Sequence, residues 1–286
     1  MYLFILPGFV YFVVFRYLPL LGSIIAFQDY SPFLGFHSPF VGLANFWALF
    51  TDPDVGVAIR NTLAISLLQL AFFFPAPIIL ALLLNSMASE PAKRVMQSVL
   101  YLPHFLSWVI VIAVWQQVFG GAGVINQALR DHGLRAVNIM GNPDFFKPLV
   151  VLQLIWKETG WGTIIILAAL ARIDPALYEA AAMDGASGWR RLRHITLPGI
   201  RGVIVLLLIL RLSRILDTGF EQLLLQRDAV GARAAEVVDT FAYYRGIHGG
   251  QWGLSAAVGL VKGVFAAIVV FLANRAAKAF GDEGAF

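Results

Sequence analysis

Long apolar runs separated by short polar loops dominate the pattern of hydrophobic and polar positions along this chain. A helix rises about 1.5 Å per residue and the hydrocarbon core of a bilayer is roughly 30 Å thick, so a transmembrane helix needs about 20 apolar residues. Segments of this kind lie at residues 2–27, 59–85, 95–119, 148–171, 200–225 and 251–274. The pattern predicts an all-α, polytopic membrane protein with six transmembrane helices in a single domain, residues 1–286.

Prolines fall inside several of these spans, at positions 7, 19, 75, 77 and 103. A proline within a transmembrane helix bends it and frees a backbone carbonyl, which neighbouring groups must satisfy. We therefore expect kinked helices.

The loops between the predicted spans differ in how densely they carry lysine and arginine. The first set of connections and ends carries Lys93, Arg94, Arg172, Arg190, Arg191, Arg193, Arg201, Arg275 and Lys278. The second set is longer and carries Arg60, Arg130, Arg135, Lys147, Arg227, Arg233 and Arg245. Because cytoplasmic loops are enriched in these residues, we predict that both termini and the loop 173–199 are cytoplasmic.

Composition agrees with a membrane protein and excludes several other classes. Hydrophobic residues make up 59% of the chain and charged residues only 13%, whereas a soluble domain carries roughly 25% charged residues. The absence of cysteine excludes disulfides, thiolate metal sites and a cysteine nucleophile. The net charge of +4 is spread over loops instead of forming the basic stripe of a nucleic-acid-binding face. Nucleic acid is therefore excluded as a partner.

The loop 173–199 is predicted to fold as two short helices. Asp174 can cap the first helix and Pro175 suits its first position. Gly185 is placed to end it in a left-handed conformation. Ser187 can then cap a second helix, "GWRRLRHI", which Pro198 is expected to close. Helices this short are not stable alone, so the loop needs a partner surface.

A spaced motif runs through the same loop: E-A-A, three residues, G, nine residues, then I-x-L-P. Its fixed positions are Glu179, Ala180, Ala181, Gly185, Ile195, Leu197 and Pro198, and Asp184 and Ala186 fit its sugar-permease form. The motif resembles the signature of the membrane (permease) subunits of binding-protein-dependent ABC importers. The resemblance implies a type I importer fold in which 173–199 is the coupling loop that contacts the ATPase.

The resemblance also implies partners and a location. We expect a second permease subunit, two cytoplasmic ATPase subunits that bind the ATP and magnesium, an extracytoplasmic solute-binding protein, and an oligosaccharide substrate. This chain would hold no cofactor or metal of its own. It would span the bacterial cytoplasmic (inner) membrane and its lipid bilayer.

Other segments resemble one branch of that family. "YLPHFLSWVIV", "WKETGWGTIIILAALARIDPALYEAAAMDGA" and "GGQWGLSAAVGLVKG" are similar to permeases that handle polysaccharide fragments, among them those of bacterial alginate importers. An acidic oligosaccharide of the alginate or uronate type is the substrate that this implies, and a neutral sugar is the alternative.

Motifs of enzymes are missing from the sequence. It contains no G-x-x-x-x-G-K-[ST] phosphate loop, no H-E-x-x-H and no G-x-S-x-G. We therefore expect ATP hydrolysis to reside in a partner subunit and this chain not to be an enzyme. For the protein as a whole, the alternative is a secondary transporter, which uses repeated halves and no ATPase. For the loop 173–199, the alternative is that Glu179 is only a solvated helix residue and that Arg190, Arg191 and Arg193 only set the membrane topology.

Ionisable side chains inside the predicted spans cost about 2.5–3.5 kcal/mol each on insertion scales, so they face protein or a watery cavity. They are Arg16, Lys157, Glu158, Arg211, Arg214, Asp217, Glu221 and Lys262. One interpretation is a ladder of ion pairs along a single helix, at spacings of three and four, with Arg214 paired to Asp217.

The other interpretation is a substrate path lined by cations. Lys157, Arg211 and Lys262 would be unpaired and, with Arg214, would contact an acidic oligosaccharide. Trp156 could stack on a sugar ring, although tryptophan near a span end is commonly an interface anchor.

The last span carries a row of small residues. Ser255, Gly259, Gly263 and Ala267 recur every four positions, which lets two helices approach closely. The row predicts a helix interface, within this chain or with a second permease subunit.

Overall fold

The computed structural model describes residues 2–279. Within these residues the chain is helical, apart from loops and one isolated antiparallel bridge between Gln28 and Phe40. The described residues contain six helical stretches long and apolar enough to cross a membrane: Phe4–Phe27, Pro53–Asn85, Trp108–Asp131, Phe146–Leu170, Gly188–Leu212 and Trp252–Ala279. The all-α, six-span prediction is confirmed.

The chain divides into two compact units, each described here by itself. The first comprises residues 2–62 and 236–265, and the second comprises 63–235 and 266–279. The prediction of one domain over residues 1–286 is not tested by this division.

The first unit is built from both ends of the chain. Its elements are α1 (Tyr2–Phe12), η1 (Val13–Tyr17), η2 (Leu18–Phe27), η3 (Gly35–His37), α2 (Ala44–Thr51), most of α3 (Pro53–Leu68), α14 (Val238–Tyr243), η7 (Tyr244–His248) and the first half of α15 (Trp252–Ala279). Its core packs the large ring of Phe241 in α14 among small side chains from η2, α3 and α15, such as Ala26, Ala58 and Ala257.

The second unit holds the middle of the chain. Its elements are η4 (Gln69–Phe73), α4 (Pro75–Asn85), α5 (Glu90–Tyr101), η5 (Leu102–Phe105), α6 (Trp108–Phe119), α7 (Val124–Asp131), α8 (Phe146–Leu170), α9 (Pro175–Met183), α10 (Gly188–Arg191), η6 (Leu192–Thr196), α11 (Leu197–Leu212), α12 (Phe220–Val230) and α13 (Ala232–Ala235), with the ends of α3 and α15.

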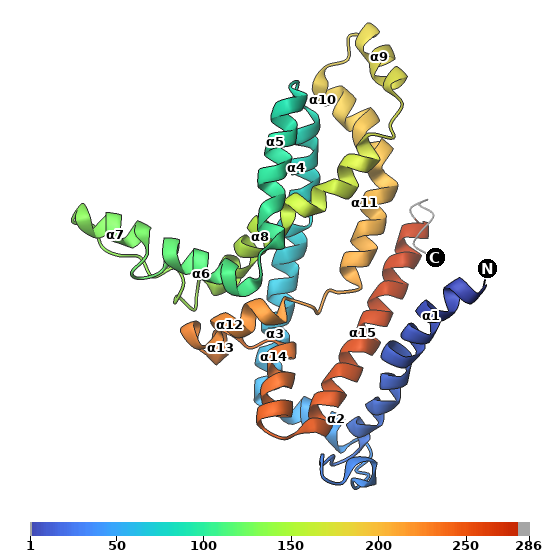
Figure 1. Ribbon diagram of the computed structural model, residues 1–286, viewed down its shortest axis with the longest axis vertical. Coiled ribbons are helices and arrows are strands. Elements are labelled where there is room, and N and C mark those ends of the chain that lie inside the picture. Colours follow the sequence, from blue (N-terminus) through green and yellow to red (C-terminus); the bar gives the residue numbers. More distant parts are fainter. Residues whose placement is uncertain (1, 280–286) are drawn as a thin grey trace. The chain divides into compact units, whose positions relative to one another are not determined.

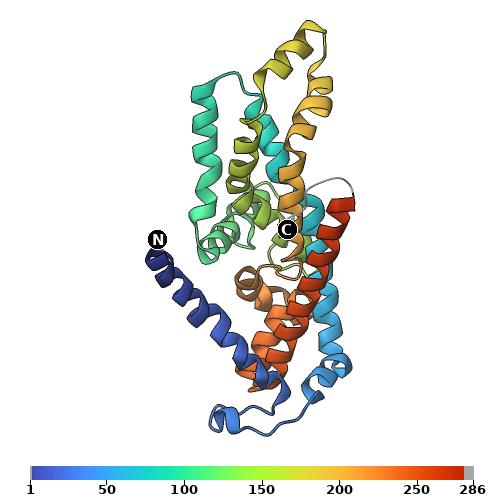
Figure 2. The same cartoon turned by 90° about the vertical axis from the view of Figure 1, so that its right-hand side faces the viewer.

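Helix α8 is the centre of this second unit. Helices α4 and α5 run beside it, as both views show (Figures 1 and 2). The close approach depends on glycine: a Cβ at Gly160 would overlap the backbone carbonyl of Leu100 in α5, and one at Gly162 would lie 2.8 Å from Pro77 in α4. Ile166 and Ala169 of α8 continue the contact into an apolar core with α4 and α11.

Three buried glutamines fasten α12 to α8. The Gln222 amide donates to the Val150 carbonyl and to the Gln153 side chain, both at 2.8 Å. The Gln153 and Gln226 amides meet at 2.9–3.0 Å. Buried polar groups require partners, so this network fixes how the two helices pack.

The predicted third and fifth spans are wrong in detail. The segment 95–119 is two helices, because Pro103 lacks an N–H and the chain restarts at Trp108 behind the Ser107 cap. The segment 200–225 is also interrupted: α11 ends at Leu212, and α12 begins after Gly219, whose φ of +100° is left-handed. At the second break the residues 213–219, "SRILDTG", are mostly polar and end in glycine, so the sequence carried a signal for this break that the span prediction overlooked.

Wide helical turns accompany several of the prolines. The π-helical segments η1, η4 and η6 end shortly before Pro19, Pro75 and Pro198, and in η4 the Phe74 N–H bonds to the Gln69 carbonyl five residues back. Such π adjustments accommodate a proline inside a membrane helix without ending it.

Candidate functional site

The loop 173–199 forms a helical hairpin, drawn in yellow and gold in Figure 1. Asp174 caps α9 by accepting a hydrogen bond from the Ala176 N–H at 2.9 Å, and Pro175 occupies the first turn. The predicted start of the first helix is confirmed.

The end of α9 is a Schellman motif. Gly185 has a φ of +69°, and its N–H bonds to the Ala182 carbonyl at 3.0 Å. The next N–H, from Ala186, bonds to the Ala181 carbonyl at 2.8 Å. This double closure is the common glycine-dependent helix end, so the predicted stop at Gly185 is confirmed.

The second helix differs from the prediction. Ser187 caps it through the Arg190 N–H, as expected. Pro198 does not close it: α10 continues through the π turn η6 directly into α11, and the whole stretch Gly188–Leu212 is one span (Figure 2). Helix α10 is therefore continuous with the fifth span.

A hydrogen bond that the sequence did not suggest ties the two arms of the hairpin together. The Tyr178 hydroxyl of α9 lies 3.0 Å from Thr196 Oγ1 of η6, and Thr196 is buried. This hydrogen bond links α9 to η6 and so holds the two arms of the hairpin together.

The outer face of the hairpin is free and partly apolar. Glu179 is exposed and its carboxylate has no partner among the described residues. Leu177, Met183 and Trp189 are 52%, 89% and 69% exposed. Of the other motif residues, Ala180, Asp184 and Pro198 are exposed, and Ala181, Ala186, Ile195 and Leu197 are half-buried. A cluster of exposed apolar side chains on a polar loop marks a protein contact surface.

Arg211 and Arg214, two of the cations predicted to contact the substrate, line one cavity of about 510 Å³ in the second unit. We call it the arginine pocket. It is lined by Phe73, Phe74, Pro77, Ile78, Gly162, Ile165, Ile166, Leu207, Leu210, Arg211, Ser213 and Arg214. The two arginines are therefore the charged groups in a cavity whose other walls are largely apolar.

The guanidinium groups of the arginine pocket are not neutralised by ion pairs. Arg211 donates to the neutral amide oxygen of Gln69 and lies 5.7 Å from the centre of the Phe73 ring. The Arg214 guanidinium has no hydrogen bond or ion pair with any described residue. Asp217 is near enough to attract Arg211, so one carboxylate faces two cations and positive charge remains.

The ladder of ion pairs along a single helix is not formed. Because α11 ends at Leu212 and Gly219 breaks the chain direction, Asp217 and Glu221 do not follow Arg211 and Arg214 on the same helix. That interpretation is wrong for this reason.

Lys157 and Lys262 are paired, contrary to the prediction. Lys157 Nζ lies 3.1 Å from Glu158 Oε1 and donates to the His104 carbonyl at 2.7 Å. Lys262 Nζ lies 2.6 Å from Asp239 Oδ1 within the first unit. Each ammonium is neutralised by its carboxylate.

The tryptophans near Lys157 pack against protein. The ring of Trp156 stands edge-on to Trp115, with centroids 6.4 Å apart, and remains 41% exposed. Trp108 lies 5.6 Å from the Lys157 ammonium. Neither ring lines the arginine pocket.

Comparisons with known proteins agree with this architecture. Residues 73–281 match the sequence family described as binding-protein-dependent transport system inner membrane component. The polygalacturonan/rhamnogalacturonan transport system permease protein YteP of Bacillus subtilis (strain 168) is 48% identical over 288 residues, covering 100% of this chain and 90% of that protein. Protein LplB of the same organism is 47% identical, covering 100% and 91%.

Two solved structures also match. One is of a bacterial ABC transporter involved in the import of the acidic polysaccharide alginate. It has a TM-score of 0.89 at 36% identity, over 98% of this chain and 96% of that chain. The other is of a bacterial alginate ABC transporter in complex with an alginate pentasaccharide-bound periplasmic protein. Its TM-score is 0.90 at 37% identity, over 99% and 95%.

Proposed function

Because this chain belongs to the family of binding-protein-dependent transport system inner membrane components, and is a multi-pass permease subunit of an ABC importer for oligosaccharides, we propose that it forms half of a translocation path for an acidic polysaccharide fragment. The other half comes from a second permease subunit. An extracytoplasmic solute-binding protein delivers the sugar, and two cytoplasmic ATPase subunits bind and hydrolyse the ATP.

The arginine pocket is the observation that carries the substrate proposal. Its two guanidinium groups retain positive charge: Arg211 lies in the last turn of the fifth span, and Arg214 follows the end of that span and is exposed. An uncompensated charge within a span is costly unless a cavity or ligand compensates it. A uronate carboxylate supplies that compensation, and guanidinium binds carboxylate in a two-point geometry. The names of YteP and of the alginate transporters, whose substrates are acidic polysaccharides, support the same substrate class.

The hairpin 173–199 is the proposed contact with the ATPase. Glu179 provides an unpaired carboxylate and Met183 and Trp189 provide exposed apolar area. ATP binding would move the hairpin together with the ATPase. Because α10 continues into α11, the movement would reach Arg211 at the far end of that helix. The hairpin and both termini are then cytoplasmic.

Charge-neutral variants test the path in the assembled complex. Arg214→Gln should reduce the maximal uptake of a uronate oligosaccharide into proteoliposomes about tenfold, because a tenfold change corresponds to about 1.4 kcal/mol and a hydrogen bond to a charged group is worth about 1.5–3 kcal/mol. Uptake of a neutral oligosaccharide of equal length should change less than about twofold by the same reasoning.

Two further variants serve as comparisons. Arg16→Gln removes a span arginine that does not line the pocket, and should leave uptake of both sugars unchanged. Lys262→Gln leaves Asp239 without its partner, so it should lower thermal stability without changing the preference between sugars. Equal loss of uronate and neutral uptake in Arg214→Gln would remove this residue from the path.

A further inference from the structure

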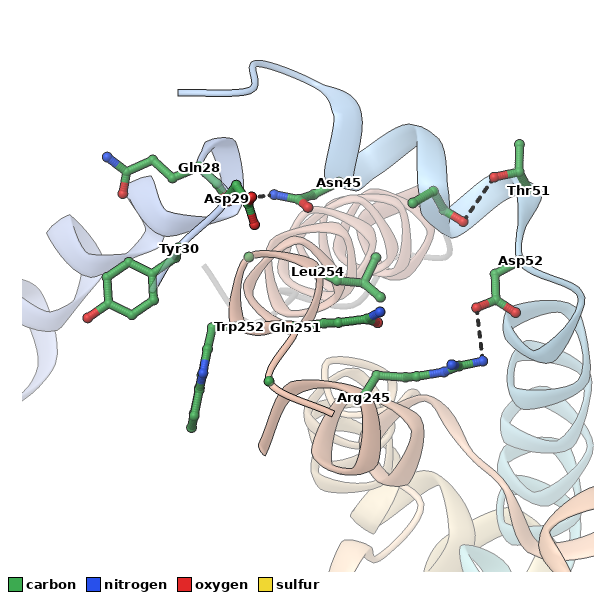
Figure 3. A pocket seen from close by; sticks show the side chains of 13 residues that line it. Gln28, Asp29, Tyr30, Asn45, Thr51, Asp52, Arg245, Gln251, Trp252 and Leu254 are labelled. Carbon is green, nitrogen blue, oxygen red and sulfur yellow. Dashed lines mark hydrogen bonds and ion pairs between the residues drawn. The ribbon is translucent and has the colours of Figure 1, made fainter. Parts of the chain in front are cut away.

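A second cavity, of about 480 Å³, lies within the first unit. Its walls come from the chain that follows η2, from α2, and from the start of α15 (Figure 3). These segments end the first span and begin the last. With both termini cytoplasmic, as proposed above, the end of the first span and the start of the last lie on the extracytoplasmic side of the membrane. We call this feature the acidic cavity.

Carboxylates outnumber cations at the acidic cavity. Arg245 is shared between two aspartates: its Nη2 lies 3.3 Å from Asp52 Oδ2 (Figure 3) and 2.8 Å from Asp54 Oδ2. Asp29 also lines the cavity and is exposed, and its own carboxylate has no partner among the described residues. The lining itself therefore carries two carboxylates, Asp29 and Asp52, and one guanidinium that is also shared with Asp54 outside the lining, so negative charge remains.

Three uncharged side chains of the lining donate hydrogen bonds to carbonyls within the chain. Asn45 donates its amide hydrogens to the carbonyls of Ala26 and Gln28, each at 2.9 Å. Gln28 donates to the Phe36 carbonyl, while its own Oε1 is buried and has no partner among the described residues. The Thr51 hydroxyl donates to a carbonyl one turn earlier. Asn45 and Thr51 keep oxygen acceptors, whereas the side-chain donors of Gln251, Tyr30 and Trp252 have no partner among the described residues.

Aromatic rings complete the lining. Tyr30 and Trp252, both half-buried, contribute to the walls of the same cavity. Carboxylates, free acceptors and aromatic faces together make a favourable site for a guanidinium or ammonium group. A uronate oligosaccharide would meet like charge at Asp29. The chemistry of this cavity therefore differs from that of the arginine pocket.

We propose that the acidic cavity receives a lysine or arginine side chain that projects from the solute-binding protein, with Asp29 as its ion-pair partner. The inference rests on the proposed function, because it requires a binding protein on this face. Charge pairs at the edge of an interface chiefly accelerate encounter and fix orientation. The pair would align the binding protein with the opening of the path while leaving its bound sugar free to enter.

Titration of ATPase activity tests the proposal. The probe is the sugar-loaded solute-binding protein that co-purifies with the intact importer, added to that importer in proteoliposomes. Asp29→Asn should raise the concentration that gives half-maximal stimulation about three- to tenfold at low salt. The difference should shrink as ionic strength rises, because the charges are solvent-exposed.

A matched control is available on the same side of the membrane. Asp144 is an exposed aspartate in the loop between α7 and α8 and does not line the cavity. Asp144→Asn should leave the titration curve and its salt dependence unchanged. An equal shift in both variants would indicate a diffuse electrostatic effect and would overturn the assignment of Asp29.

Crosslinking gives an independent readout, because the chain contains no native cysteine. Asp29→Cys labelled with a maleimide–benzophenone reagent should capture the binding protein, at a peptide that mass spectrometry shows to contain a surface lysine or arginine. Asp144→Cys should give no such product. Capture at an acidic or apolar surface would contradict the proposed chemistry.

The outcomes separate this proposal from the proposed function. If no binding protein stimulates the unaltered importer, the proposed function fails and the docking site fails with it. If stimulation is normal and Asp29→Asn behaves like the unaltered importer, only the docking site is overturned. If Asp29→Asn instead alters the response to free oligosaccharide alone, the cavity is a sugar subsite and the docking proposal is wrong.

Discussion

Among single residues, Gly160 occupies the position with the least space. Any side chain would enter the backbone of α5 at Leu100, which cannot move away without displacing the helix. Gly263, in the middle of α15, is the opposite case: no described atom lies within 4 Å of a Cβ placed there. The two glycines have the same backbone conformation and differ in what surrounds them.

We expect Gly160→Ala to destabilise the protein by about 1–3 kcal/mol, the usual cost of overpacking a tight contact. The apparent midpoint of thermal unfolding of the detergent-purified importer should fall by several degrees. Gly263→Ala should leave the midpoint unchanged or raise it, because alanine is favoured over glycine in a helix by roughly 1 kcal/mol. A fall of similar size in both variants would show that helix propensity, and not the contact with α5, governs the result.

The sequence could not single out Gly160. Its small-residue pattern pointed to Gly259 and Gly263, and neither meets a described neighbour in this chain. Their role in contact with a second permease stays a prediction. The sequence pattern also did not reveal which charged side chains form ion pairs: Lys262 pairs with Asp239, which lies 23 residues earlier in another helix. Such partners depend on tertiary packing, which local patterns do not encode.

Among the elements, the hairpin 173–199 was predictable because its signals are local. A cap at Asp174, a left-handed stop at Gly185 and a second cap at Ser187 each depend on a few neighbouring residues. The fifth span was predicted too long, because the charged residues after Leu212 were counted as part of the span although α11 ends there and α12 begins after Gly219. The three-glutamine network was missed, although glutamines within apolar runs are a signal, since buried amides require partners.

The bend at Gly185 should be essential to the hairpin. A β-branched side chain in the left-handed region costs about 1–2 kcal/mol, so Gly185→Val should uncouple ATP hydrolysis from uptake. Asparagine tolerates this conformation, and Gly185→Asn should retain most activity. Gly188→Val tests a glycine without positive φ and with open space around it. Uptake per ATP hydrolysed is the measurement, and an equal effect of valine at both positions would contradict a role for the bend.

At the scale of the whole molecule, the described residues include two charged cavities of opposite sign. The arginine pocket contains two guanidinium groups, and the acidic cavity contains unmatched carboxylates. An anionic sugar is attracted by the first and repelled by the second. The two cavities therefore favour ligands of opposite charge.

A crosslinking experiment can test whether the hairpin 173–199 contacts the ATPase subunit. If energy enters through the hairpin, a residue on its contact face must lie against the ATPase. Ala181→Cys is suited to this test, because the position is half-buried in the hairpin and the chain has no other cysteine. A short thiol-reactive crosslinker should join it to a co-purified nucleotide hydrolase, and the yield should change when ATP is bound. Asp144→Cys should never reach that subunit. Ion-gradient-driven uptake by the chain alone, with no crosslink from Ala181→Cys, would instead indicate a secondary transporter.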